Sequence, residues 1–188
     1  MEFLSRKHPA MYRHCVRVAI LADKLADELA LDDASKRALI IGSFLHDVGV
    51  GLFPSELWIP QAKLTSEQLN IRLLHAQAGA DLMRSHSELG PEVLEIIRHH
   101  HEHYDGSGYP DGLAGEKIPY LARVCAVLDD FDRLVNDSFE SGGQPCRVAQ
   151  AREGIREGAG TRYDEAIVEA FMDIPVSVLQ LYVLSPPV

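Results

Sequence analysis

The segment EVLEIIRHHHEHYDGSGYPDGLAGEKIPYLARVCAVLDD, residues 92–130, contains a predicted helix, a loop and the start of a second predicted helix. Apolar residues of the first helix share one helical stripe with His100, which directs a histidine toward the core. Glycines and prolines between residues 103 and 119 exclude a regular helix there. The second helix follows, and its apolar run ends at Asp129. This segment therefore predicts two core helices, joined by a loop and carrying metal-capable side chains.

Further helices are predicted on both sides of this segment from apolar residues spaced three and four apart. Asp32 or Asp33 serves as one N-cap, and Thr65 with Gln68 forms a capping box for another helix. A stretch with two prolines and the only tryptophan, residues 48–64, is predicted to be an irregular crossover. The predicted helices cover residues 9–29, 33–47, 65–82, 91–101, 120–137, 146–157, 163–172 and 176–184.

No strand pattern or internal repeat interrupts these helices, so the sequence predicts an all-α fold. We expect one helical bundle of about seven or eight helices in a single domain, residues 1–188. The loop around residues 103–119 lies between two of the core helices.

Composition and charge exclude several classes of function. The net charge of −10 argues against binding to nucleic acid or to an anionic membrane surface, because both require clustered Lys and Arg. No apolar run approaches the ~20 residues that span a bilayer, and the N-terminus lacks a secretory signal, which favours the cytoplasm. The three cysteines, Cys15, Cys125 and Cys146, form no close pair and are interpreted as packing residues.

Histidines and aspartates recur on the predicted inward faces of the helices. One buried histidine alone is more often a hydrogen-bonded core residue than a metal ligand. Burying the whole set would be costly without a shared partner, and a pair of divalent cations is the simplest one. Imidazole and carboxylate ligands without thiolates suit iron, manganese or zinc. The set comprises His14, His46, Asp47, His75, the run His99–His101 and Asp129.

This order of residues resembles the HD superfamily of metal-dependent phosphohydrolases. The sequence HHEHYDGSGYP, residues 100–110, is similar to the HHExxDGxGYP signature of the HD-GYP subgroup. The resemblance covers residues 9–173, and a C-terminal helix at about 175–185 follows. It implies an all-α bundle that hydrolyses cyclic di-GMP to pGpG or GMP.

The resemblance also implies a centre of two metal ions, most often iron or manganese, with Asp47 as the bridging ligand and a metal-bound hydroxide as the nucleophile. One ion would be held by His14, His46, Asp47 and Asp129, and the other by Asp47, His75, His100 and His101. A third ion is not expected, because Ala10 stands where some members have a glutamate.

In the loop, the resemblance places Tyr109 near the substrate entrance and makes Glu102 and Asp105 groups that brace the loop or orient the histidines. Gly106, Gly108 and Pro110 complete the signature, although glycines there could simply permit tight turns. The loop is also a possible docking surface for a partner protein.

Two departures from the family pattern affect substrate recognition. Val50 replaces the lysine of the HDxGK pattern, and Ser138 stands in a region where basic residues are usual. An aliphatic side chain cannot neutralise a phosphate oxygen, and losing one such donor commonly costs ~100-fold or more in rate. Pro60 also stands where a basic residue is usual in the crossover. Candidate substitute cations are Lys63, Arg98, Lys117 and Arg123, the last of which could instead pair with a nearby acid.

Three functions therefore remain open. The first is a cyclic-dinucleotide phosphodiesterase, slowed by Val50. The second is a non-catalytic signalling module that keeps its metals and binds a cyclic dinucleotide or docks a partner through the loop. The third is another HD-superfamily activity on a phosphomonoester or in diiron chemistry. A homodimer is compatible with each of them.

Overall fold

The structure is a computed structural model that describes residues 1–59, 63–140 and 148–184, with only the backbone described at 137–140 and 182–184. Its α-helices are α1 (Glu2–Lys7), α2 (Pro9–Glu28), α3 (Asp33–Leu45), α4 (Ser66–Leu73), α5 (His75–Met83), α6 (Pro91–His99), α7 (Tyr120–Glu140), α8 (Val148–Glu157), α9 (Glu165–Asp173) and α10 (Val176–Leu184). Three 3₁₀ helices lie between them: η1 (Val48–Leu52), η2 (Ser55–Trp58) and η3 (Gly115–Lys117). The all-α prediction is confirmed for the described residues.

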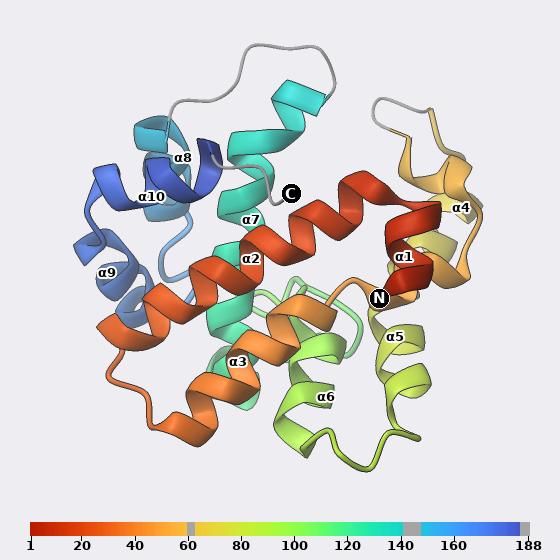
Figure 1. Ribbon diagram of the computed structural model, residues 1–188, viewed down its shortest axis with the longest axis horizontal. Helices are drawn as coiled ribbons and strands as arrows, with labels where there is room; N and C mark the ends of the chain where they lie inside the picture. The colour runs from red at the N-terminus through yellow and green to blue at the C-terminus, as the bar shows by residue number, and fades with distance from the viewer. Residues whose placement is uncertain (60–62, 141–147, 185–188) are drawn as a thin grey trace.

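The long helices α2 and α7 form the centre of the bundle. Figure 1 shows α2 crossing the molecule diagonally, with α8, α9 and α10 beside one end and α1, α4 and α5 near the other. The largest apolar cluster joins α2, α3 and α7 to α8 and α9 through fully buried side chains such as Leu25, Phe131 and Phe171. A smaller cluster, around Ile97, packs α5 and α6 together. This packing fixes the positions of α2 and α7 relative to their neighbours, and both helices contribute to the polar cluster described below.

Several predicted helix starts are confirmed. The Asp32 carboxylate accepts hydrogen bonds from the backbone amides of Ala34 and Ser35, so it is the N-cap of α3. Thr65 and Gln68 exchange both bonds of a capping box at the start of α4. Pro residues open α2 and α6, where no intrahelical N–H bond is lost.

The number of helices exceeds the predicted seven or eight for two reasons. The N-terminal residues form the short helix α1, which the spacing of apolar residues did not indicate. The predicted helix over residues 65–82 is divided into α4 and α5 at Leu74. Next to this break, the His75 ring nitrogen Nδ1 lies 2.8 Å from the Arg72 carbonyl oxygen. The ring therefore bonds to a backbone carbonyl that a continuous helix would use for its own hydrogen bonds. The break at Leu74 therefore accompanies the position that the His75 ring takes up.

Cys15 and Cys125 are buried free thiols, in agreement with a packing role, whereas Cys146 lies outside the described residues. In the part of the chain that the structure describes, no helix combines the length and apolarity needed to cross a bilayer.

Candidate metal centre

The polar cluster is assembled from helix ends as much as from helix faces. His14 lies on α2 and Asp129 on α7, as predicted. His75 is the first residue of α5, also as predicted. For the remaining four members the prediction of a place within a helix was wrong: His46 and His100 cap the C-termini of α3 and α6, and Asp47 and His101 follow them. A side chain just past a helix end is less tied to the helical register, which lets side chains from five helices converge.

The predicted ligands form two adjoining groups that share Asp47. The first consists of Asp47, His75, His100 and His101, and the second of His14, His46, Asp47 and Asp129; in each, the potential ligand atoms lie within 4.8 Å of one another. Every member is buried except His101, which is partly exposed. The structure therefore brings together all seven residues, in the division that the resemblance implies.

The histidine tautomers in this cluster are set by backbone carbonyls. The Nδ1 atoms of His46, His75 and His100 lie 2.6, 2.8 and 2.9 Å from the carbonyl oxygens of Ser43, Arg72 and Ile97. A carbonyl oxygen only accepts, so each Nδ1 carries the proton and donates it. In the neutral ring the Nε2 atom then presents a lone pair to the centre of the cluster, which is the arrangement of a metal-ligating imidazole.

Several of these inward-facing atoms lack an adequate protein partner. The buried Asp47 Oδ1 and His100 Nε2 atoms make no hydrogen bond. The Nε2 atoms of His75 and His101 approach each other at 3.2 Å, as do those of His14 and His46. Two lone pairs at this separation need a cation or a proton between them. The donor set and its unmet bonds therefore fit divalent cations.

Burial lowers the pKa of two histidines in the first group, His100 and His101. It lowers the pKa of His100 to about 4 and holds the pKa of His101 well below its usual range. Both rings are consequently neutral near pH 7, as a metal ligand must be. In the second group, burial acts to lower the pKa of His46, but Asp47, Cys15 and Asp129 together outweigh it and raise that pKa well above the ordinary value.

Asp132 supports His14 and was missed by the sequence analysis. Its Oδ2 atom lies 2.7 Å from His14 Nδ1, and both its oxygens accept from the Arg17 guanidinium at 2.8 Å. Asn136 adds a bond to the same carboxylate. A carboxylate behind a ligating imidazole orients the ring and raises its basicity. The signal was available, because Asp132 follows Asp129 by three positions and shares its helix face.

Replacing Asp132 with alanine is expected to weaken metal binding at the His14 side about 10–100-fold, the usual cost of losing such a support. Titration of the chelator-treated protein with Mn²⁺ resolves the two sites and should show one weakened. The variant Asp132→Asn keeps an acceptor for His14 Nδ1 and should lose less. Equal affinities for wild-type protein and Asp132→Ala would show that His14 needs no such support.

Arg133 also contacts the centre and was not predicted. Its Nη2 atom lies 2.7 Å from Asp47 Oδ2 and its Nε atom 2.8 Å from Asp129 Oδ1. The carboxylates are at most 1% exposed, whereas the arginine side chain is 22% exposed. One guanidinium therefore bonds both to Asp47, which the two groups share, and to Asp129 of the second group.

The loop that follows α6 is braced by Glu102. This buried carboxylate accepts hydrogen bonds from the backbone amides of Asp111 and Leu113. Asp105 accepts from the amide of Ser107, and the positive φ of Gly106 gives the loop its turn. A Cβ atom on Gly108 would lie 2.3 Å from the His103 nitrogen, so only glycine fits there. Loop bracing, predicted for Glu102 and Asp105, agrees with these contacts.

Tyr109 connects this loop to the cluster. Its amide donates to the His101 carbonyl oxygen, and its ring stacks on the His101 ring with centroids 4.8 Å apart. The adjoining Pro110 has a cis peptide bond. The Trp58 ring meets the His75 ring edge-on, with centroids 5.3 Å apart. Aromatic rings thus flank the histidines of the first group.

The substitute cations suggested by the sequence lie outside the cluster. Arg98 forms a two-bond pair with Asp111, Lys63 is exposed in a loop, and Lys117 is exposed at the end of η3. Arg123 donates to the Ile118 carbonyl and pairs with Asp164, which supports the alternative that it is a structural partner of an acid. Val50 is completely buried among Leu4 and Cys15. Pro60 and the Ser138 side chain lie outside the described residues.

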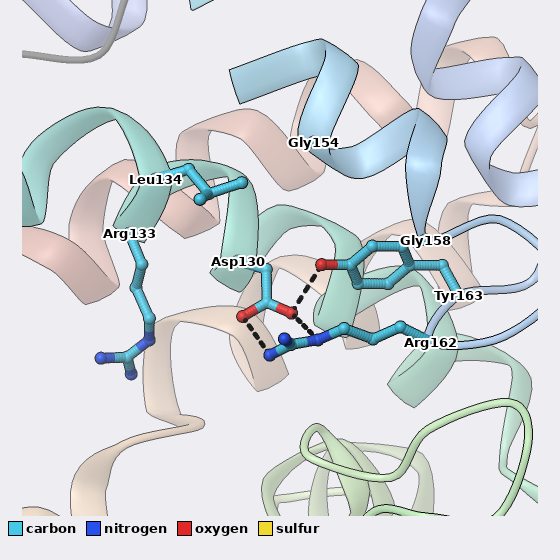
Figure 2. A pocket seen from close by; sticks show the side chains of 7 residues that line it. All are labelled: Asp130, Arg133, Leu134, Gly154, Gly158, Arg162 and Tyr163. Atoms are coloured by element: carbon cyan, nitrogen blue, oxygen red, sulfur yellow. Dashed lines mark hydrogen bonds and ion pairs between the residues drawn. The ribbon is translucent and has the colours of Figure 1, made fainter. Parts of the chain in front are cut away.

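A cavity of about 400 Å³ opens beside the centre. Figure 2 shows Asp130 held by Arg162 and the Tyr163 hydroxyl, with Arg133 on the other side of the cavity. Leu134, Gly154 and Gly158 complete its lining. Arg133 is therefore common to the candidate metal centre and to the adjoining cavity.

Comparison with known proteins places this geometry in a family. A family model described as HD domain matches residues 1–167. The chain is 34% identical over 161 residues to the cyclic di-GMP phosphodiesterase PA4108 of Pseudomonas aeruginosa, covering 86% of this chain and 38% of that protein. It is 30% identical over 172 residues to a cyclic di-GMP phosphodiesterase of Thermotoga maritima, covering 91% and 46%. The chain thus spans less than half the length of these relatives.

Solved structures show the same fold. The HD domain of the L. monocytogenes phosphodiesterase PgpH, in complex with cyclic-di-AMP, matches with a TM-score of 0.70 at 20% identity, covering 100% of this chain and 98% of that one. Bd1817, an HDG"Y"P protein from Bdellovibrio bacteriovorus, matches with a TM-score of 0.70 at 24% identity over 89% of this chain and 51% of that one. At these identities the likeness concerns the fold.

Proposed function

Because the chain belongs to the HD-domain family, we propose that it is a metal-dependent phosphodiesterase that hydrolyses cyclic di-GMP to pGpG or GMP. The observation that carries this proposal is the pair of adjoining ligand groups sharing the buried Asp47. The matched relatives named as cyclic di-GMP phosphodiesterases support the substrate. The resemblance to the HD-GYP subgroup that the sequence indicates is confirmed by the same comparisons.

The residues of the centre have separate tasks in this reaction. Two divalent cations, when bound, would lower the pKa of a water molecule and offset charge on the attacking and leaving oxygens. Asp47 would hold both ions, with His14, His46 and Asp129 on one side and His75, His100 and His101 on the other. Carbonyl bonds at Nδ1 keep three of these rings oriented before any ligand arrives. Tyr109, stacked on His101, would border the substrate.

Iron or manganese is the proposed metal. Five imidazoles and two carboxylates form a donor set richer in nitrogen than magnesium or calcium sites require, and no cysteine takes part in either group. Two ions are proposed, with Ala10 at the position where a third would need a carboxylate.

The test is hydrolysis of cyclic di-GMP by protein loaded anaerobically with Fe²⁺ or Mn²⁺, followed by chromatography of the products. We expect pGpG or GMP, with turnover that chelation removes and metal restores. Two bound ions per chain without any turnover would contradict the assignment for this substrate. That result would favour a binding module, and release of free phosphate from a monoester would favour another HD-superfamily activity.

A further inference from the structure

The position of Arg133 has a consequence for metal binding. Its guanidinium donates to Asp47 Oδ2 and Asp129 Oδ1 at 2.7 and 2.8 Å. Both carboxylates belong to the candidate ligand groups. Arg133 therefore contacts carboxylate oxygens that divalent cations would also bind, so the arginine and the cations would compete for the same two side chains.

Loading the centre changes the balance of charge around this side chain. Two divalent cations bring four positive charges close to the guanidinium, and the carboxylates that attracted it become metal ligands. Arg133 is partly exposed and lines the cavity of about 400 Å³, so its side chain has room to turn away from the ions. The guanidinium would then face the cavity, where an anion is its most favourable partner.

Two other arginines near the centre are paired with acids, and the Arg72 guanidinium lies over the Trp58 ring. Arg98 is paired with Asp111, and Arg162 is paired with Asp130 across the cavity. Val50 is completely buried in an apolar cluster and carries no charge. Arg133 is thus the basic side chain that the structure places against both ligand groups.

We propose that Arg133 is a phosphate-binding residue: with the ions in place, its guanidinium contacts a non-bridging phosphate oxygen of the substrate and supplies the positive charge that Val50 cannot. This inference rests on the proposed phosphodiesterase function. A planar guanidinium suits the role because it presents parallel N–H donors to two oxygens of one phosphate. No group is transferred to or from the arginine, whose task is recognition.

A purely structural role for Arg133 predicts the opposite effect on metal binding. If the arginine only orients Asp47 and Asp129, then Arg133→Gln should weaken binding of Mn²⁺. If it competes with the ions for the carboxylates and then turns to phosphate, the same substitution should leave Mn²⁺ affinity unchanged or raise it. The two roles are therefore separated by a measurement that involves no turnover.

The experiment uses the full chain, with Arg133→Gln, Arg133→Lys and the control Arg156→Gln. Arg156 lies on α8 in an exposed pair with Glu153, away from the centre. Calorimetry measures Mn²⁺ binding to chelator-treated protein and inorganic phosphate binding to Mn²⁺-loaded protein. Arg133→Gln should bind phosphate about 10–100-fold more weakly, the equivalent of one charge-assisted contact, without weaker Mn²⁺ binding. Arg133→Lys should recover most of the loss and Arg156→Gln should match wild type.

Kinetics with cyclic di-GMP complete the test. Arg133→Gln should lower kcat/KM about 100-fold at saturating Mn²⁺, and lysine should restore part of it. Phosphate binding by Arg133→Gln equal to wild type, or weaker Mn²⁺ binding in this variant, would overturn the proposal. Wild-type protein that binds phosphate through Arg133 but does not hydrolyse cyclic di-GMP would refute the proposed function and leave the arginine's role standing. Failure of wild-type protein to bind Mn²⁺ would overturn both.

Discussion

Substitution of Asp47 by alanine should lower cyclic di-GMP turnover by at least about 10³-fold, the upper end of the effect of removing one preorganised electrostatic group. Asp47 is the one residue common to both ligand groups, so its loss weakens both ion sites together. Its carboxylate is completely buried, 3.0 Å from His75 Nε2 and 3.4 Å from His46 Nε2. The metal content of Asp47→Ala should fall below that of a variant lacking one terminal ligand.

The measurement pairs product chromatography with metal quantification on the same samples. Asp27→Ala is the matched control, because it removes a carboxylate that is 56% exposed and pairs with Lys36 on the outer face of α2. It should retain both metals and full turnover. Turnover by Asp47→Ala within tenfold of wild type would rule out a shared-carboxylate centre as the source of activity.

The second large effect is expected at Gly49, where η1 lies directly against α5. A Cβ atom at this position would be 2.1 Å from the His75 carbonyl oxygen and 2.7 Å from the Gly79 nitrogen. Both are backbone atoms, so the clash can be relieved only by moving η1 away from α5. We expect Gly49→Ala to lower the free energy of unfolding by about 3 kcal/mol, the upper end for overpacking. It should also weaken metal binding, because Asp47 and His75 lie on the two segments that separate.

Urea unfolding of the metal-free protein measures the first effect, and Mn²⁺ titration measures the second. Gly51→Ala is the matched control from the same 3₁₀ helix. There a Cβ atom would meet only side chains, first the ring of Phe3 at 2.8 Å, and Phe3 is 59% exposed and free to move aside. Its cost should stay within about 1 kcal/mol. Equal stabilities for Gly49→Ala and Gly51→Ala would mean that η1 and α5 are not packed as described.

The fold was predictable because most of its information is local. Spacing of apolar residues, the Asp32 cap and the capping box at Thr65 located helix starts that the structure confirms. The break between α4 and α5 was not predictable in the same way. It follows from the His75 ring bonding to a carbonyl of the preceding turn while its other nitrogen meets the cluster. A tertiary requirement there overrode a continuous apolar pattern.

The ligand types and their division into two groups followed from residue order and the resemblance, and the structure brings the same residues together. The side chains that contact these ligands could not be predicted from residue order or from the resemblance. Sequence alone did not reveal that Asp132 reaches His14 across 118 positions, or that Arg133 reaches Asp47 across 86. The sequence offered four basic residues as substitute cations, Lys63, Arg98, Lys117 and Arg123. In the structure they lie outside the centre, and Arg133 contacts it instead.

By itself, the sequence determined an all-α chain with a histidine–aspartate set and a glycine-rich loop, because helical periodicity and turn residues act over a few neighbouring positions. Only the tertiary structure decided which nitrogen of each histidine faces the centre, that Val50 is enclosed in apolar packing, and that Arg133 joins the centre to the neighbouring cavity. These features depend on segments far apart in the chain meeting at helix ends. Their geometry comes from packing between helices, which no local pattern encodes.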